Sequence, residues 1–245
     1  MLNTFVIALR EGLEASLIVG ILIAYLHKSG RTQLLKSLWF GVFSAIGASL
    51  LFGAFLTFTS TTLSDSGEKY FVGFTGLVAV GLVTWMIFWM KKTARFMKLE
   101  LEQKASAAIS AGALSLAAFT AVIREGLETS LFLYANFKGS DPLGSTIGLT
   151  AGIAVAIALG YGIYKGAIRF NLATFFKFSG VALMLVAANV FAYSLHELEE
   201  VGLFFSGSAN KIAALIYIAL VLPPYLAKPK PVTPAEAAKK ISFAK

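Results

Sequence analysis

The chain has 245 residues, of which 57% are hydrophobic and only 14% are charged, and its mean hydropathy is +0.76. These values exclude an ordinary soluble domain and indicate an integral membrane protein. The net charge of +8 suggests a nucleic-acid partner at first sight, but membrane topology explains the basic residues more simply, so no nucleic acid is expected. Because there is no cysteine, any metal site must use oxygen or imidazole ligands.

Apolar runs divide the chain into seven candidate membrane spans. A hydrocarbon core of about 30 Å is crossed by roughly 20 helical residues, and each run is close to that length. The sequence therefore predicts an all-α membrane protein with seven transmembrane helices in contact with the lipid bilayer. The last helix is the weakest of these predictions, because Pro223 and Pro224 lie near its end. The predicted spans lie near 3–26, 37–59, 70–90, 109–135, 145–166, 172–195 and 210–227.

The basic residues between these spans predict the orientation. Sixteen of the 21 Lys and Arg residues fall in alternate segments, whereas the other loops hold only Lys69, Lys138 and Lys211. Loops rich in Lys and Arg face the cytoplasm, so the N-terminus is expected outside and the C-terminus in the cytoplasm. The four basic segments are 27–36, 91–108, 165–177 and 228–245, with 3, 5, 3 and 5 basic residues.

The acidic residues outside the spans follow the opposite distribution. Six of them fall in the predicted outer loops, where a negative rim would concentrate cations at an entrance. For Asp65, Glu68 and Asp141, ordinary solvated loop charges are the favoured interpretation. The six are Asp65, Glu68, Asp141, Glu197, Glu199 and Glu200.

Two segments of the chain repeat each other. FVIALREGLEASL (5–17) and FTAVIREGLETSL (119–131) are identical at 8 of 13 positions, and FTGLVAVGLV (74–83) is echoed more weakly by FSGVALMLVA (178–187). Such self-similarity predicts a repeated unit, here of three helices. Because each unit has an odd number of spans, the two units would be inverted, a 3+3 arrangement that in transporters places the substrate site near the midplane.

The repeat defines the predicted organisation of the chain. A single seven-helix transmembrane domain is expected at 1–227, followed by a basic cytoplasmic tail at 228–245. Within the domain, repeat one covers about 3–90, repeat two about 109–195 and the seventh helix about 210–227.

The shared R-E-G-L-E motif places charged residues inside two predicted spans. On a helix, Glu11 and Glu14 project from one face about 60° apart, and Arg10 can pair with Glu14. Each charged group at the bilayer centre costs roughly 2.5–3.5 kcal/mol on insertion scales. Both motifs together bring four carboxylates and two guanidinium groups: Glu11, Glu14, Glu125 and Glu128, with Arg10 and Arg124.

Two interpretations of this cluster compete. The arginines and glutamates can form a clamp that only holds two helices together in a non-transporting scaffold. However, two arginines neutralise two acids and the motifs supply four, which leaves a charge of −2 and favours a cation site. Carboxylates from facing helices at i, i+3 spacing are typical of iron and manganese sites in helix bundles. The metal site is the favoured interpretation.

The sixth predicted span ends in YSLHELEE, which adds a second candidate site. An imidazole beside carboxylates often binds transition metals, so His196 with Glu197 or Glu200 can form an outer entry site. An interfacial histidine among solvated acids is an equally good interpretation of the spacing alone.

Small residues at helical spacing have a different predicted role. Gly12, Ser16 and Gly20, and likewise Gly144, Gly148 and Gly152, recur every four residues. On the first helix this strip points about 150° away from the glutamates. Both strips are therefore expected to let another helix approach closely, without lining the site.

With its seven spans, paired R-E-G-L-E motifs and the H-E-L-E-E sequence, the chain resembles the oxidase-dependent iron permease family over nearly its whole length except the tail. The resemblance implies that Glu11, Glu14, Glu125 and Glu128 bind iron during passage, with Arg10 and Arg124 as motif partners. It also implies a plasma-membrane (bacterial inner-membrane) location and an extracytoplasmic ferroxidase-type or iron-delivery protein as partner. The family often has glutamine where this chain has Glu199.

The expected function is therefore import of iron, as Fe²⁺ or Fe³⁺, with iron as the transported substrate and no permanently bound cofactor. Transport of another cation, manganese or lead, is the closest alternative. An intramembrane enzyme or electron carrier is disfavoured, because the chain has two distant histidines, no cysteine and no Ser/His/Asp cluster.

Overall fold

The computed structural model describes residues 1–93, 106, 110–137, 141–165, 172–203 and 209–227. Within these ranges the chain forms seven long α-helices, one short 3-10 helix and no β-strand, so the all-α prediction is confirmed there. The predicted tail, 228–245, lies outside the described residues. In chain order the elements are α1 (Leu2–Lys28), η1 (Thr32–Leu34), α2 (Leu35–Thr62), α3 (Asp65–Thr93), α5 (Ala111–Phe137), α6 (Pro142–Tyr164), α7 (Leu172–Glu200) and α8 (Ala209–Leu226).

Four helical segments of the described chain are long and apolar enough to cross a membrane. The helices α1 and α5 have 27 residues each, but an arginine and two glutamates near the middle of each make them less apolar. The apolar part of α8, Ile212–Leu226, is shorter. The protein is thus a multi-pass membrane protein, and the count of seven spans stays a prediction. The four segments are Thr32–Thr62, Asp65–Lys91, Pro142–Tyr164 and Thr174–Glu200.

The helix α7 extends beyond its predicted span. The sequence predicted that the sixth span ends near residue 195, but α7 continues to Glu200 because Leu and Glu are strong helix formers. The acids after His196, which the sequence placed in an outer loop, therefore lie on the last turns of a helix. The helix α8 contains Pro223 and Pro224 in its last turn and ends at Leu226, two residues after the second proline.

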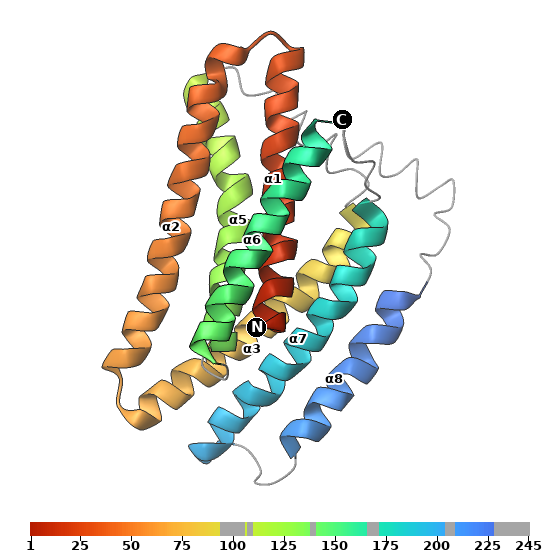
Figure 1. Cartoon of the computed structure of the whole chain (residues 1–245). Helices are drawn as coiled ribbons and strands as arrows, with labels where there is room; N and C mark the ends of the chain where they lie inside the picture. Colours follow the sequence, from red (N-terminus) through yellow and green to blue (C-terminus); the bar gives the residue numbers. More distant parts are fainter. Residues whose placement is uncertain (94–105, 107–109, 138–140, 166–171, 204–208, 228–245) are drawn as a thin grey trace, which may run out of the picture.

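Six of the helices of the described chain pack mainly in three pairs, α1 with α6, α2 with α5, and α3 with α7. The first helix, α1, packs along α6, and α2 packs along α5, while α1 and α5 also contact each other. Figure 1 shows that α3 and α7 run side by side, obliquely to these four helices. The remaining helix, α8, packs along α7, and its Tyr217 reaches α3 through a 2.7 Å hydrogen bond with Thr84.

Small residues allow the close approach of α1 and α6, as the sequence predicted. A Cβ atom added at Gly12 would lie 2.9 Å from the Ala156 Cβ. On α6, a Cβ atom at Gly152 would lie 2.7 Å from the carbonyl oxygen of Phe5 and 2.8 Å from the Ala8 Cβ. All three distances are shorter than Cβ atoms tolerate, so Gly12 and Gly152 are required for the helices to pack this closely.

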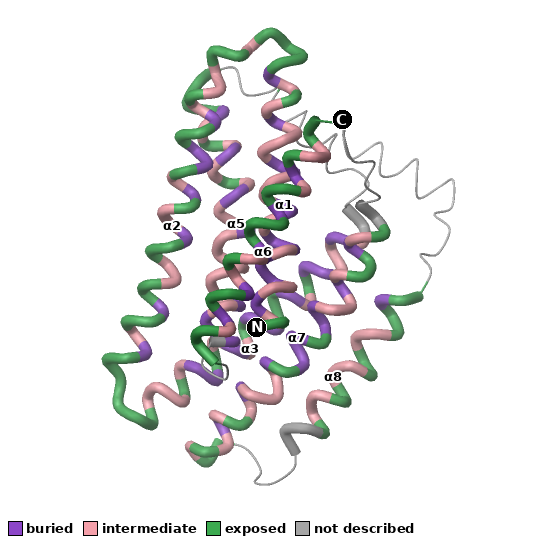
Figure 2. The backbone as a smooth tube through the Cα atoms, viewed as in Figure 1, coloured by how far each residue is buried: buried purple, intermediate pink, exposed green. Residues whose placement is uncertain are grey.

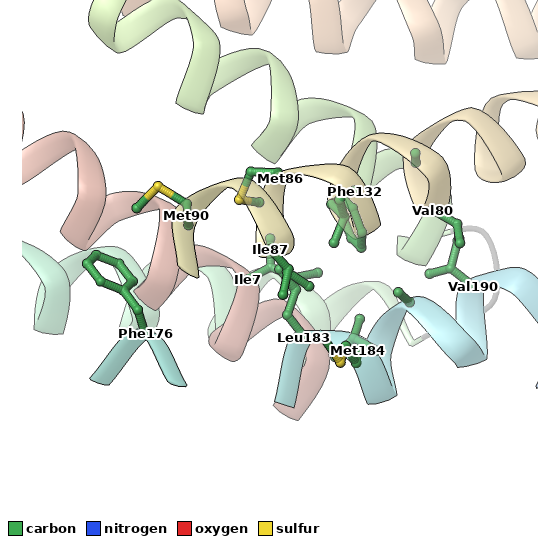
Figure 3. Close-up of a cluster of buried hydrophobic side chains, with 14 of the residues drawn as sticks. Ile7, Val80, Met86, Ile87, Met90, Phe132, Phe176, Leu183, Met184 and Val190 are labelled. Carbon is green, nitrogen blue, oxygen red and sulfur yellow. The ribbon is translucent and has the colours of Figure 1, made fainter. Parts of the chain in front are cut away.

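Buried side chains gather where α1, α3, α5 and α7 meet. Figure 2 shows the burial concentrated toward this junction, while α2 and α6 expose long faces. On α2 the exposed face is apolar, with Phe40, Leu51 and Phe58 each at least 70% exposed, as expected for side chains that face lipid. The largest apolar core contains residues of the motif helices and of α3 and α7, among them Ile7, Met86, Ile87 and Leu183, drawn in Figure 3.

Candidate metal centre

The first R-E-G-L-E motif lies near the middle of α1 and is almost fully buried. Arg10, Glu11 and Glu14 are 1%, 3% and 1% exposed. They share the buried side of α1, because positions three and four apart on a helix face the same way. The intervening Gly12 faces α6, so one helix presents its charged residues inward and its small residues to a packing partner.

Arg10 pairs with both glutamates of its own motif. Its Nη1 donates to Glu11 Oε1 at 3.1 Å, and its Nη2 lies 3.1 Å from Glu14 Oε1. The i, i+4 spacing predicts the pairing with Glu14, and the contact with Glu11 is an addition that the structure shows. A single guanidinium group therefore serves two carboxylates.

The second motif on α5 has a different arrangement. Arg124 Nε donates to Glu128 Oε1 at 3.0 Å, and both side chains are partly buried. Glu125 is buried, and the described residues hold no arginine or lysine in ion-pair contact with it. The two motifs are alike in sequence but engage their arginines differently.

Carboxylates of the two motifs converge where α1 meets α5. Glu11, Glu14 and Glu125 each offer an oxygen atom, and these atoms lie within 4.8 Å of one another. Glu128 is not a member of this group, although it interacts electrostatically with Glu11, Glu14 and Glu125. The structure thus brings three of the four predicted glutamates together and places the fourth beside them, next to Arg124.

Several carboxylate oxygens in this cluster lack hydrogen-bond donors. Glu11 Oε2, Glu125 Oε2 and Glu128 Oε2 are buried and accept no hydrogen bond from the described residues. Buried polar atoms are normally paired, because an unpaired one loses its solvation without compensation. Converging carboxylate oxygens are hard donors that suit Fe²⁺, Fe³⁺ or Mn²⁺, so the arrangement can bind a cation of this kind.

The helix α3 also contributes to this site, which the motifs alone do not predict. Met86 Sδ accepts a hydrogen bond from Arg10 Nη2 at 2.9 Å. The guanidinium carbon of Arg124 lies 4.3 Å from the ring centroid of Trp89 and 6.0 Å from that of Trp85. Two tryptophans four residues apart in the third span were a visible signal, but only the fold shows that they face an arginine of another helix.

The predicted outer entry residues lie at the end of α7. His196 Nε2 is 3.2 Å from Glu200 Oε1, and Glu197 accepts a hydrogen bond from the Tyr193 hydroxyl. Lys69 of α3 lies 2.5 Å from Glu200 Oε2, a pairing that sequence analysis did not predict. His196, Glu197 and Glu200 are therefore close neighbours, and one of the acids already has a cationic partner.

These features define the class of protein: a multi-pass helical membrane protein with a buried, predominantly acidic cluster between two of its helices. The chain belongs to the iron permease FTR1 family, whose model matches residues 1–217. The family match confirms the resemblance found in the sequence. Together with the apolar helices, it also confirms that the chain is a permease of the inner (plasma) membrane.

Curated relatives agree with this assignment. The chain is 37% identical over 209 residues to the ferrous iron permease EfeU of Escherichia coli O6:K15:H31 (strain 536 / UPEC), a match that covers 83% of this chain and 76% of the relative. The ferrous iron permease EfeU of Yersinia pestis is 36% identical over 209 residues, with 83% and 74% covered. No solved structure matches the chain.

Proposed function

We propose that the chain imports iron across the plasma membrane and that the cargo passes a carboxylate site formed by its two R-E-G-L-E motifs. Glu11, Glu14 and Glu125 are the proposed ligands, and Glu128 is the fourth acid of the site. Arg10 and Arg124 are the motif partners that limit the negative charge. The relatives named above are ferrous iron permeases, which favours Fe²⁺ as the cargo.

The convergence of three buried carboxylates from two helices is the observation that carries this proposal. The cluster contains four glutamates and two arginines, so its formal charge is −2 when every group is ionised. Uncompensated charge in a membrane interior is costly. A cation that binds the unpaired oxygens of Glu11 and Glu125 would reduce that cost, and this gives the site a physical reason to bind its cargo.

The packing of the helices supports an inverted repeat as the framework of transport. If α1–α3 correspond to α5–α7, the α1/α6 contact is equivalent to the α5/α2 contact, while α1/α5 and α3/α7 are each equivalent to themselves. A pseudo-two-fold axis would produce this pattern and would place the glutamates at the repeat interface. We retain seven spans, an outer N-terminus and a single permease domain at 1–227 as part of the proposal.

The outer end of α7 is the proposed entrance. Iron would first meet His196, Glu197 and Glu200, and then move inward to the carboxylates between α1 and α5. Because Lys69 pairs with Glu200, a metal ion that binds there would have to displace it. An extracytoplasmic ferroxidase-type or iron-delivery protein is the proposed partner at this entrance.

A structural clamp is the second candidate role for the cluster. Arg10 bridges Glu11 and Glu14, which is the contact that a clamp requires. Both of these pairs, however, lie within α1, so they do not join two helices. The clamp also leaves Glu125 without a charged partner, and the metal site accounts for Glu125 better.

Uptake by purified protein in proteoliposomes tests the proposed function. We expect saturable, protein-dependent accumulation of Fe²⁺, with little inhibition by equal concentrations of Mn²⁺ or Pb²⁺. Protein-free vesicles are the control for leakage. Faster uptake of Mn²⁺ or Pb²⁺ than of iron would transfer the function to another cation, and absence of protein-dependent uptake of all three would support the clamp.

A further inference from the structure

The two motif arginines differ in the number of glutamates that they contact. Arg10 is buried and lies between Glu11 and Glu14. Arg124 makes one hydrogen bond, from Nε to Glu128, and its buried Nη2 has no hydrogen-bond partner among the described residues. Arg124 is therefore the cation of the cluster that is most free to change partners.

A change of partner by Arg124 would alter the candidate metal site. Arg124 interacts electrostatically with Glu125 and Glu14 as well as with Glu128. A guanidinium group forms strong bidentate pairs with carboxylates. If Arg124 turned toward Glu125, it would occupy the one carboxylate of the three-glutamate group that has no arginine partner.

The indole of Trp89 contacts the guanidinium group of Arg124. The guanidinium carbon lies 4.3 Å from the centroid of the Trp89 ring, well within the distance for a cation–π interaction. Trp89 is half-buried and packs against the main apolar core, so its ring is fixed by neighbouring side chains. Trp85 is 6.0 Å away and 59% exposed, so it contributes less.

We infer that Trp89 is a positioning residue for the metal site, because its cation–π contact keeps Arg124 beside Glu128 and leaves Glu125 available to the cation. This inference rests on the proposed function and adds a third helix, α3, to the site. The same helix contacts Arg10 through Met86, three residues before Trp89. One face of α3 therefore contacts both motif arginines.

Replacement of Trp89 by leucine or by phenylalanine separates this role from simple packing. Both residues fill apolar space, but only phenylalanine retains an aromatic face. We expect Trp89→Leu to weaken equilibrium binding of Fe²⁺ by detergent-solubilised protein about 5- to 30-fold, as loss of a partly desolvated cation–π contact implies. Trp89→Phe should remain within about threefold of the unchanged protein. Equal losses in the two variants would overturn the inference.

A double variant tests whether Trp89 acts through Arg124. In an Arg124→Gln background there is no guanidinium group to position, so Trp89→Leu should change Fe²⁺ affinity less than about twofold. A purely structural role would produce the same loss in both backgrounds and would contradict the inference. Trp85→Leu is the matched control, since this tryptophan lies on the same helix, one turn earlier, and is expected to cause the smaller loss.

The same binding assay distinguishes failure of the inference from failure of the proposed function. Glu125→Gln should lose Fe²⁺ binding if the carboxylate site is correct. Loss in Glu125→Gln together with normal binding in Trp89→Leu would refute only the role of Trp89. Normal binding in Glu125→Gln would refute the site itself, and the role of Trp89 with it.

Discussion

Replacement of Glu11 or Glu125 by glutamine is expected to abolish iron uptake while the protein still reaches the membrane. Glutamine keeps the size of the side chain but removes the negative charge and one strong metal-binding oxygen. Even residues that only support metal ligands typically contribute 10- to 100-fold to affinity, so we expect a loss of at least about tenfold for a ligand itself. Radioactive iron accumulation in cells, normalised to the amount of membrane-inserted protein, measures this effect.

An acid outside the site provides the control. Asp65 is exposed in the first turn of α3, and Asp65→Asn should leave uptake unchanged. Glu128→Gln should have a smaller effect than Glu125→Gln, because Glu128 lies outside the three-carboxylate group and already pairs with Arg124. Unimpaired uptake by both Glu11→Gln and Glu125→Gln would remove the site from the proposal.

Removal of Arg10 is expected to destabilise the protein more than any other single change in the cluster. Arg10→Gln would leave Glu11 and Glu14 buried without their shared cation. Loss of one member of a buried ion pair typically costs about 3–5 kcal/mol, and the burial of both partners here gives no reason to discount that range for solvent screening. The melting temperature of the detergent-solubilised protein without metal should therefore fall sharply.

Arg124→Gln is the matched variant for this prediction. The side chain of Arg124 is 31% exposed, so water can compensate for part of its loss and the decrease in melting temperature should be smaller. Added Fe²⁺ should recover part of the stability of Arg10→Gln, because a ligand that binds only the folded state stabilises it. Arg10→Gln protein that melts at the same temperature as unchanged protein would show that the arginine does not neutralise the cluster.

Local patterns in the sequence were sufficient to predict the helices and the convergence of the motifs. The apolar runs of the sequence predicted the positions of the seven α-helices within the described residues. The i, i+3 spacing of Glu11 and Glu14 predicted that both face the same side of their helix, and both are buried. The repeat predicted a site between its two units, which requires α1 and α5, the helices that carry the motifs, to meet. The glycine strips predicted the close packing of α1 against α6.

Contacts that depend on side-chain direction between helices were not predictable. The motifs are nearly identical, yet Arg10 bridges two glutamates and Arg124 stacks on Trp89. The two arginines also have different partners on α3, Met86 for Arg10 and Trp89 for Arg124, and neither motif encodes these contacts. The pairing of Lys69 with Glu200 similarly depends on the N-terminal end of α3 lying beside the C-terminal end of α7.

The position of bound iron tests the central claim most directly. Anomalous X-ray diffraction at the iron absorption edge, from crystals of the protein with Fe²⁺, locates the metal without reference to transport activity. We predict a peak within bonding distance of carboxylate oxygens from Glu11, Glu14 and Glu125, between α1 and α5, that disappears in Glu125→Gln. A peak confined to His196 and Glu200 at the outer end of α7, or a peak that persists between α1 and α5 in Glu125→Gln, would contradict the account.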